Sequence, residues 1–291
     1  MPTWDDVVKA GARRFARTLD ITAEEARREA QVLLCSTLGV ERGWLAAHDR
    51  DPAPPESLDG IENCFARREQ GEPVAYITGV REFCGLKFQV GPDVLIPRPE
   101  TELAVELARG FVPADSAANI LDLGTGSGAI AVALAHFCPR ARITATDISE
   151  QTLAMARRNA GLLMPSRVRL MHSDWYGALT GEQFDLIVSN PPYLARDDAH
   201  LQALRFEPAG ALVAGTDGLD CLRRVIGGAP AHLAPGGYLL VEHGSDQAPA
   251  CAHLFRQAGF ESVEAHPDLA GIARVTLGRL PDLAADADSP A

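Results

Sequence analysis

NILDLGTGSGAIAVALA, residues 119–135, decides the fold of this 291-residue chain. Its apolar start, glycine-rich middle and alanine-rich end predict a buried strand, a tight turn and a helix. Gly124, Gly126 and Gly128 let the backbone approach a ligand closely just before the helix begins. The turn also fits the dinucleotide-binding fingerprint, with Ala129 in the position of the third glycine. Alternatively, the glycines could serve only to pack the strand tightly against the helix. The motif therefore favours a nucleotide-like cofactor without naming it.

Apolar runs alternate with helix-forming stretches from this point onward. The expected strands read NILDLG, ARITATD, RVRLMHSD, FDLIVSN and GYLLVEHG. Buried strands separated by helices predict a parallel sheet that helices cover on both faces. ESVEAHPD and ARVTLGRL could add a last pair of strands. The predicted fold class is therefore α/β.

The first 75 residues instead predict a small bundle of helices. Thr3 and Thr22 stand at expected amino-terminal caps, and the glutamate three residues after Thr22 completes the spacing of a capping box. Two strands are expected next, in VAYITG and EFCGLKFQVG, joined as a hairpin across Val80 and Arg81. Pro99 suits the first turn of the following helix. The expected segments are a helical domain (1–75), a hairpin linker (76–99), an α/β domain (100–281) and a flexible tail (282–291).

Composition narrows the classes of function. The net charge of −12 has the wrong sign for a protein that binds nucleic acid along its surface. The six cysteines form no C-x-x-C pair, which fits reduced thiols better than disulfides. Neither the cysteines nor the eight histidines form a metal-ligand pattern, so no metal site is expected. The acidic start of the chain and the lack of a long apolar run predict a soluble, cytoplasmic protein with no membrane partner.

Two acidic residues end predicted strands. Asp147 ends the second strand about 20 residues after the glycine turn, where a carboxylate can bind the ribose hydroxyls of NAD or of S-adenosylmethionine. It could instead cap the next helix. Asp174 and Trp175 end the third strand, where the acid could accept from an adenine amino group and the indole could cover a ring face. The alternative for Trp175 is a side chain that fills a gap between helices.

The segment SNPPY, residues 189–193, follows the fourth strand of the predicted sheet. Two prolines lack the N–H that would continue a ladder, so they fix the backbone instead. The side-chain oxygen of Asn190 and the carbonyl of Pro191 are then two fixed acceptors, which suit a planar nitrogen with two hydrogens. Tyr193 can pack against a flat substrate. A simple turn is the alternative, but open α/β sheets bind their ligands at this edge.

DLGTGSG, TD, SDW and SNPPY, in this order, resemble class I S-adenosylmethionine-dependent methyltransferases that modify planar nitrogens. GVREFCGLKF, VLIPRPETE, RFEP and VEHG narrow the resemblance to the N5-glutamine methyltransferases of peptide chain release factors. The resemblance covers nearly the whole chain, as far as ARVTLGR. It implies a Rossmann-like class I methyltransferase domain behind a helical domain that docks the protein substrate.

The resemblance also implies the cofactor, the partner and the site. The cofactor is S-adenosyl-L-methionine and the partner is a release factor, with no metal and no direct nucleic-acid contact. The cofactor site comprises Gly124, Thr125, Gly126, Ser127, Gly128, Asp147, Trp175 and Asn190. The glutamine is bound by Asn190, Pro191, Pro192 and Tyr193, of which Asn190, Pro191 and Tyr193 are catalytic.

Other interpretations stay open at this point. Cys84 and Gly85 after Phe83 resemble the sister enzymes that methylate a glutamine of ribosomal protein L3, whereas RPETE, residues 98–102, fits the release-factor branch. Ala273 stands where relatives often have a polar residue, which weakens any role for the last strand pair. DNA adenine N6-methyltransferases share the NPPY motif but need a basic face. A protein that only senses a nucleotide would not need the acceptor pair at Asn190.

Overall fold

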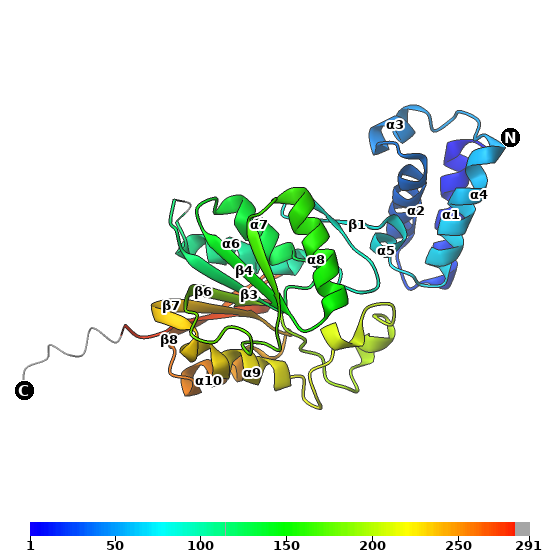
Figure 1. The fold of residues 1–291 in the computed structure, drawn as a ribbon. Coiled ribbons are helices and arrows are strands. Elements are labelled where there is room, and N and C mark those ends of the chain that lie inside the picture. Colours follow the sequence, from blue (N-terminus) through cyan, green and yellow to red (C-terminus); the bar gives the residue numbers. More distant parts are fainter. Residues whose placement is uncertain (114, 283–291) are drawn as a thin grey trace, which may run out of the picture. The chain divides into compact units, whose positions relative to one another are not determined.

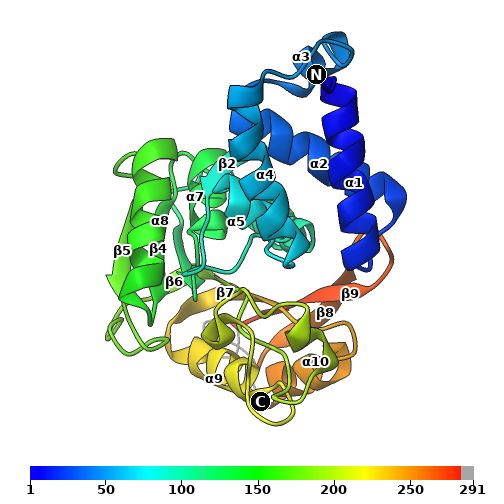
Figure 2. The ribbon, with the colours of Figure 1, turned by 90° about the vertical axis from the view of Figure 1, so that its right-hand side faces the viewer.

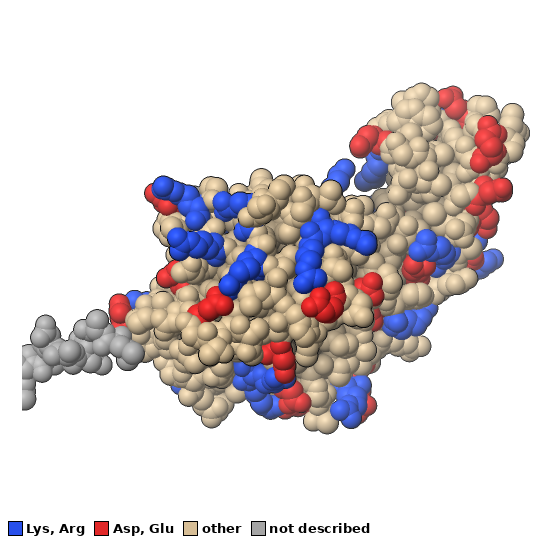
Figure 3. All heavy atoms as spheres, viewed as in Figure 1, with Lys and Arg blue, Asp and Glu red and all other residues tan. Residues whose placement is uncertain are grey.

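The computed structural model describes residues 1–113 and 115–282 and divides the chain into two compact units, Met1–Val80 and a second unit from Arg81 onward. Figure 1 shows both units. The predicted tail, 282–291, lies outside the described residues except for Asp282. None of the described helices is long and apolar enough to cross a membrane. Basic and acidic side chains both occur on the face drawn in Figure 3.

The first unit consists of helices, as predicted for residues 1–75. They are α1 (Trp4–Thr18), α2 (Ala23–Leu38), α3 (Arg42–Ala47), α4 (Pro55–Glu69) and α5 (Val74–Thr78). Thr3 and Thr22 cap α1 and α2, each with the reciprocal contacts of a capping box, so both predicted caps are confirmed. The rings of Phe15 and Phe65 meet edge to face at 5.4 Å in the core of this unit.

The predicted hairpin is misplaced by several residues. VAYITG is not a strand but the short helix α5, which begins after Pro73 and ends at Gly79 with φ +74°. A five-residue apolar run fits a buried helix turn as well as a strand, and the flanking proline and glycine decided between them. The hairpin is instead β1 (Val80–Phe83) and β2 (Leu86–Gln89). Its turn lies at Cys84 and Gly85, with φ +51° and +77°, the positive values that a tight two-residue hairpin turn requires.

A seven-stranded sheet forms the second unit. Its strands are β3 (Asn119–Leu123), β4 (Arg142–Asp147), β5 (Val168–His172), β6 (Phe184–Ser189), β7 (Leu233–Glu242), β8 (Glu261–Pro267) and β9 (Ala273–Arg279). They lie in the order β5-β4-β3-β6-β7-β9-β8, with β9 antiparallel to both of its neighbours. The predicted parallel sheet and the closing strand pair are confirmed. The chain order changes direction between β3 and β6, and ligands bind at such a switch point in open α/β sheets.

Helices cover both faces of this sheet, as predicted (Figure 1 and Figure 2). One face packs on α6 (Glu102–Phe111), α7 (Ala129–Phe137) and α8 (Glu150–Leu163), and the other on α9 (Asp220–Gly228) and α10 (Ala248–Gln257). Ile120 points into the first core and its neighbour Leu121 into the second, because successive strand residues face opposite sides. Short 3₁₀ turns are η1 (Pro99–Thr101), η2 (Ala199–Gln202), η3 (Ala209–Ala211) and η4 (Ala229–Ala231).

Asn159 of α8 connects the hairpin to the glycine turn. Its side-chain oxygen accepts from Gln89 N at 2.8 Å, and its amide nitrogen donates to Gln89 O at 3.0 Å and to Ser127 O at 2.8 Å. The Asn159 side chain is buried, so no water can replace these three bonds at low cost. The position of the glycine turn is therefore set from α8 as well as from β3.

Candidate functional site

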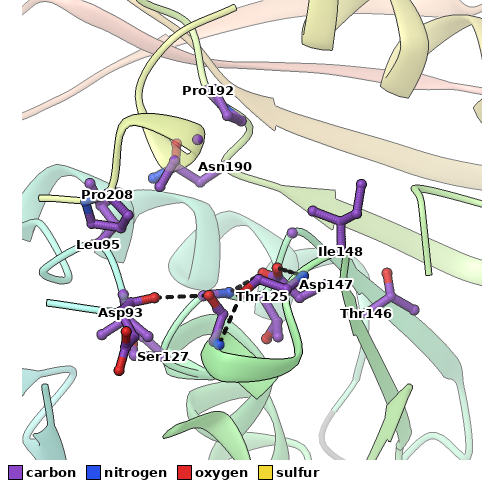
Figure 4. A pocket seen from close by; sticks show the side chains of 18 of the residues that line it. Asp93, Leu95, Thr125, Ser127, Thr146, Asp147, Ile148, Asn190, Pro192 and Pro208 are labelled. Carbon is purple, nitrogen blue, oxygen red and sulfur yellow. Dashed lines mark hydrogen bonds between the residues drawn. The ribbon is translucent and has the colours of Figure 1, made fainter. Parts of the chain in front are cut away.

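A cavity of about 540 Å³ opens at the carboxyl ends of β3, β4, β5 and β6. Its walls come from the glycine turn after β3, the ends of β4 and β5, the NPPY turn, residues 92–101, and the loop that contains η3. Figure 4 shows Thr125, Ser127 and Asp147 on one side of it and Asn190 and Pro192 on another. The volume is in the usual range for a small-molecule site.

The glycine turn has the backbone that only glycine adopts easily. Gly124, Gly126 and Gly128 have φ values of +71°, +57° and +84°. Gly124 N and Thr125 N both donate to Thr146 O at 2.9 Å, which fixes the turn against the end of β4. Gly128 does not line the cavity. A Cβ there would lie 3.4 Å from Ala156, so this glycine lets α7 and α8 approach closely.

Asp122 lies inside β3, fully buried, and the sequence reasoning did not single it out. Its Oδ2 accepts from Thr125 Oγ1 at 2.6 Å and from Ala131 N at 3.1 Å, so it holds both ends of the glycine turn. Its Oδ1 has no partner among the described residues. Burial raises the pKa of Asp122 to about 7, although the two hydrogen bonds lower it. The sequence feature that could have identified this residue is an acidic side chain within an otherwise apolar strand.

Asp147 lines the cavity at the end of β4. Its Oδ2 accepts from Gly126 N at 3.1 Å and its Oδ1 from Ser149 N at 3.0 Å, while burial raises its pKa. The side chain that caps α8 is that of Ser149, which accepts from Thr152 N at 3.2 Å. Each oxygen of Asp147 keeps a further lone pair that a ligand hydroxyl could donate to.

Trp175 lines the cavity with an unusual backbone, φ +51°. Positive φ in a bulky residue costs energy and is found mostly at functional sites. A Cβ on Gly124 would lie 3.8 Å from the Trp175 ring, so the indole lies directly over the glycine turn. The neighbouring Asp174 also lines the cavity and forms an ion pair with Arg224 at 2.9 Å. Arg224 is 5.9 Å from the centroid of the Trp175 ring.

The NPPY turn leaves the end of β6 and contributes two residues, Asn190 and Pro192, to the cavity lining. The amide nitrogen of Asn190 donates to Thr101 Oγ1 at 3.0 Å. Pro191 is buried and Tyr193 packs on the core beneath α9 and α10, so neither side chain lines the cavity. Burial raises the pKa of Tyr193 to about 12. The carbonyl of Tyr193 accepts from Gln247 at 2.9 Å, which anchors the turn.

Residues 92–101 and the loop after β6 lie side by side in the wall of the cavity. The buried Glu207 joins them, because it accepts from Ile96 N at 3.0 Å and forms an ion pair with Arg98. Arg98 and Thr101 line the cavity, as does Pro208 next to Glu207. Both motifs, RPETE and RFEP, belong to the family resemblance, but the sequence alone predicted no role for these residues. Only the fold brings residue 98 beside residue 207.

The structure thus gathers most of the predicted site in one cavity. Lining residues are Gly124, Thr125, Gly126, Ser127, Asp147, Trp175, Asn190 and Pro192. Gly128 and the side chains of Pro191 and Tyr193 lie behind this lining and support it. Among the described residues, no group of three or more histidine, cysteine or acidic side chains could hold a metal ion.

Comparison with known proteins identifies the family. The Methyltransferase small domain model matches residues 103–207, and the PrmC N-terminal domain model matches residues 8–79. The release factor glutamine methyltransferase of Bordetella pertussis is 52% identical over 87% of this chain and 95% of its own length. That of Burkholderia pseudomallei is 49% identical over 87% of this chain and 92% of its own length. This chain belongs to the release factor glutamine methyltransferase family.

The predicted family and enzyme class are therefore confirmed, and the chain is a methyltransferase. A solved T. thermophilus 16S rRNA methyltransferase, in complex with AdoMet and guanosine, has a TM-score of 0.52 at 20% identity. The match covers 69% of this chain and 49% of that one, and it supports the fold alone. In this member of the release factor glutamine methyltransferase family, the cavity thus lies at the switch point of a Rossmann-like sheet.

Asp122 should make stability fall as pH rises. Its folded-state pKa, about 7, lies above the ordinary value of 3.8, so between these values the folded protein binds more protons than the unfolded chain. From pH 5 to pH 8 this group should lower the free energy of unfolding by about 2–3 kcal/mol. Asp122→Asn should lose that part of the pH dependence, measured by urea denaturation at both pH values. The same pH dependence in variant and parent would contradict a buried, titrating Asp122.

Proposed function

We propose that this enzyme transfers a methyl group from S-adenosylmethionine to the side-chain amide nitrogen, N5, of a glutamine in peptide chain release factors. One observation carries the proposal: the NPPY turn with Asn190 faces the same cavity as the glycine turn and Asp147. A cofactor and a planar amide could therefore meet there. The names of the relatives in Bordetella pertussis and Burkholderia pseudomallei support the substrate.

The lining chemistry fits S-adenosylmethionine. Asp147 offers carboxylate lone pairs to ribose hydroxyls, and the Trp175 indole offers a flat apolar face to the adenine ring. The positive-φ glycines have no side chains, so a ligand in the cavity can approach the backbone at Gly126 closely. When bound, S-adenosylmethionine supplies an electrophilic methyl group on a sulfonium.

The chain must orient a poor nucleophile. An amide nitrogen attacks weakly because its lone pair is delocalised into the carbonyl group. The oxygens of Asn190 and Pro191 would accept hydrogen bonds from the two N–H groups of the glutamine amide. These bonds would hold the nitrogen in line with the methyl carbon. They would also stabilise the positive charge that grows on the nitrogen. NPPY contains no acid or histidine, so we assign no general base in it, and the proton leaves to water.

The protein substrate and the setting follow from the same proposal. The helical unit, Met1–Val80, would dock the release factor, in keeping with the match of residues 8–79 to the PrmC N-terminal domain. All six cysteines are free thiols, which fits a reducing cytoplasm. Duplex DNA is disfavoured as a substrate by the net charge of −12.

Asp147→Ala tests the cofactor assignment. Removing two acceptors for ribose hydroxyls should weaken S-adenosylmethionine binding by about 1–3 kcal/mol in isothermal titration calorimetry. Thr22→Ala is the control, because it removes the cap of α2, outside the cavity, and should lower the melting temperature with little change in affinity. Parental affinity in a folded Asp147→Ala variant would show that the carboxylate serves only the backbone.

Asn190→Ala tests the acceptor pair. The variant should keep its fold and most of its cofactor affinity while methyl transfer falls about 10²–10³-fold, the usual effect of removing one preorganised polar group. Asn190→Asp keeps an acceptor but places a negative charge near the sulfonium, so it should also lose rate while binding the cofactor. Parental turnover in the alanine variant would reduce NPPY to a structural turn.

The decisive experiment mixes the purified enzyme with labelled S-adenosylmethionine and, separately, a release factor, ribosomal protein L3 and duplex DNA. We expect label in the release factor, and mass spectrometry should place about one methyl group on a single glutamine, since a positioned nucleophile is methylated at one site. Asn190→Ala provides the background. Preferential labelling of L3 or of DNA would overturn the release-factor assignment.

A further inference from the structure

RPETE and VEHG have no role in the reaction as described so far, yet the fold brings both motifs to Asn190. Thr101 of RPETE ends η1 and is 5% exposed. Glu242 of VEHG ends β7, the strand next to β6, and is 2% exposed. Asn190 directly follows β6 and donates to Thr101 Oγ1 at 3.0 Å. Three polar side chains distant in sequence, of which Thr101 and Glu242 are buried and Asn190 is half-buried, thus form one cluster at the cavity wall.

The acid lies beside the other two side chains, because Asn190, directly after β6, and Glu242, the last residue of β7, occupy neighbouring positions on paired strands. The Thr101 hydroxyl and the Asn190 amide lower the pKa of the Glu242 carboxyl as hydrogen-bond donors, and its Oε2 has no partner in the described part of the chain. Burial and the nearby Glu100 raise the pKa of Glu242, to about 7. Thr101, Arg274 and Asn190 act in the opposite direction and lower it. A buried carboxyl with an unpartnered oxygen costs stability, which suggests a benefit elsewhere.

The chemistry of these groups fixes the direction of the bonds. Above its pKa of about 7 Glu242 is ionised and its carboxylate can only accept, so the hydroxyl hydrogen of Thr101 then points to Glu242. The oxygen of Thr101 can then only accept from Asn190, which places the NH₂ group of the amide on this side. The oxygen of the same amide, Oδ1, then faces the cavity. Without the carboxylate, Thr101 could donate to a flipped amide, and Asn190 would then present NH₂ to the substrate.

We propose that Glu242 is a positioning residue: directly and through Thr101 it orients the Asn190 amide so that the amide oxygen accepts from the glutamine nitrogen. The inference rests on the proposed function, because it explains how one acceptor of that site is oriented. A flipped amide would place a donor against a nitrogen that also carries hydrogens. Glu242 would therefore act on turnover without touching the substrate.

The test is a double-mutant cycle on methyl transfer to a release factor. Glu242→Gln keeps the side-chain volume but can donate as well as accept, and Thr101→Val removes the hydroxyl. Each single variant should lower kcat on the order of tenfold, with little change in KM for the release factor or in Kd for S-adenosylmethionine. The double variant should be no slower than Glu242→Gln, because the effect of Thr101 on Asn190 depends on Glu242. Thr101→Ser should recover most of the rate lost in Thr101→Val.

Stability separates positioning from a structural role. Glu242→Gln removes a buried charge, so its melting temperature above pH 7 should equal or exceed that of the parent. Thr276→Val is the matched control, since Thr276 is a fully buried hydroxyl on β9 bonded to His243 at 2.9 Å. That control should lower the melting temperature and leave kcat unchanged.

Two results would overturn the positioning role while leaving the proposed function intact. One is a parental kcat for Glu242→Gln, and the other is a double variant whose loss equals the product of both single losses. A parental enzyme that labels no release factor at all would overturn the proposed function and this inference with it.

Discussion

A carboxyl group buried among apolar residues must find hydrogen-bond donors, and the site depends on this constraint. Asp122 of β3 takes its donors from the glycine turn and from the start of α7. Glu207 takes its donors from Ile96 and Arg98. Glu242 of β7 has Thr101 and Asn190 of the NPPY turn as the donors that lower its pKa. The glycine turn, residues 92–101 and the NPPY turn are thus each held beside a buried acid, and these loops stay in place because the acids would otherwise be unsatisfied.

This arrangement exchanges stability for preorganisation. Burial raises the pKa of both Asp122 and Glu242 to about 7, so the folded protein resists their ionisation. Apolar residues of similar size would cost less, but they could not orient a threonine hydroxyl or an asparagine amide. The positive φ of Trp175 is a further local cost in the same cavity. A site that must align an unreactive amide nitrogen gains rate from such fixed geometry.

Local signals predicted most of the fold correctly. The two capping boxes, the strand–turn–helix around Gly124 and the alternation of strands and helices all depend on neighbours within a few residues. The one clear error, VAYITG, was an apolar run too short for periodicity to separate helix from strand. There the outcome depended on Pro73 and Gly79, which start and end a single helical turn. The Cys84–Gly85 hairpin turn was likewise decided by backbone conformation rather than by hydrophobic pattern.

From the sequence alone one could establish the fold class, the family resemblance and the main lining residues, because glycine turns, prolines and strand-ending acids follow from local backbone chemistry. The sequence could not show that Asn190 meets Thr101, 89 positions away, or that Glu242 adjoins both. Nor could it place Gly128 against α8 instead of in the cavity. Strand order and helix packing make those contacts, and hydrophobic periodicity specifies which face of an element is buried but not which partner covers it.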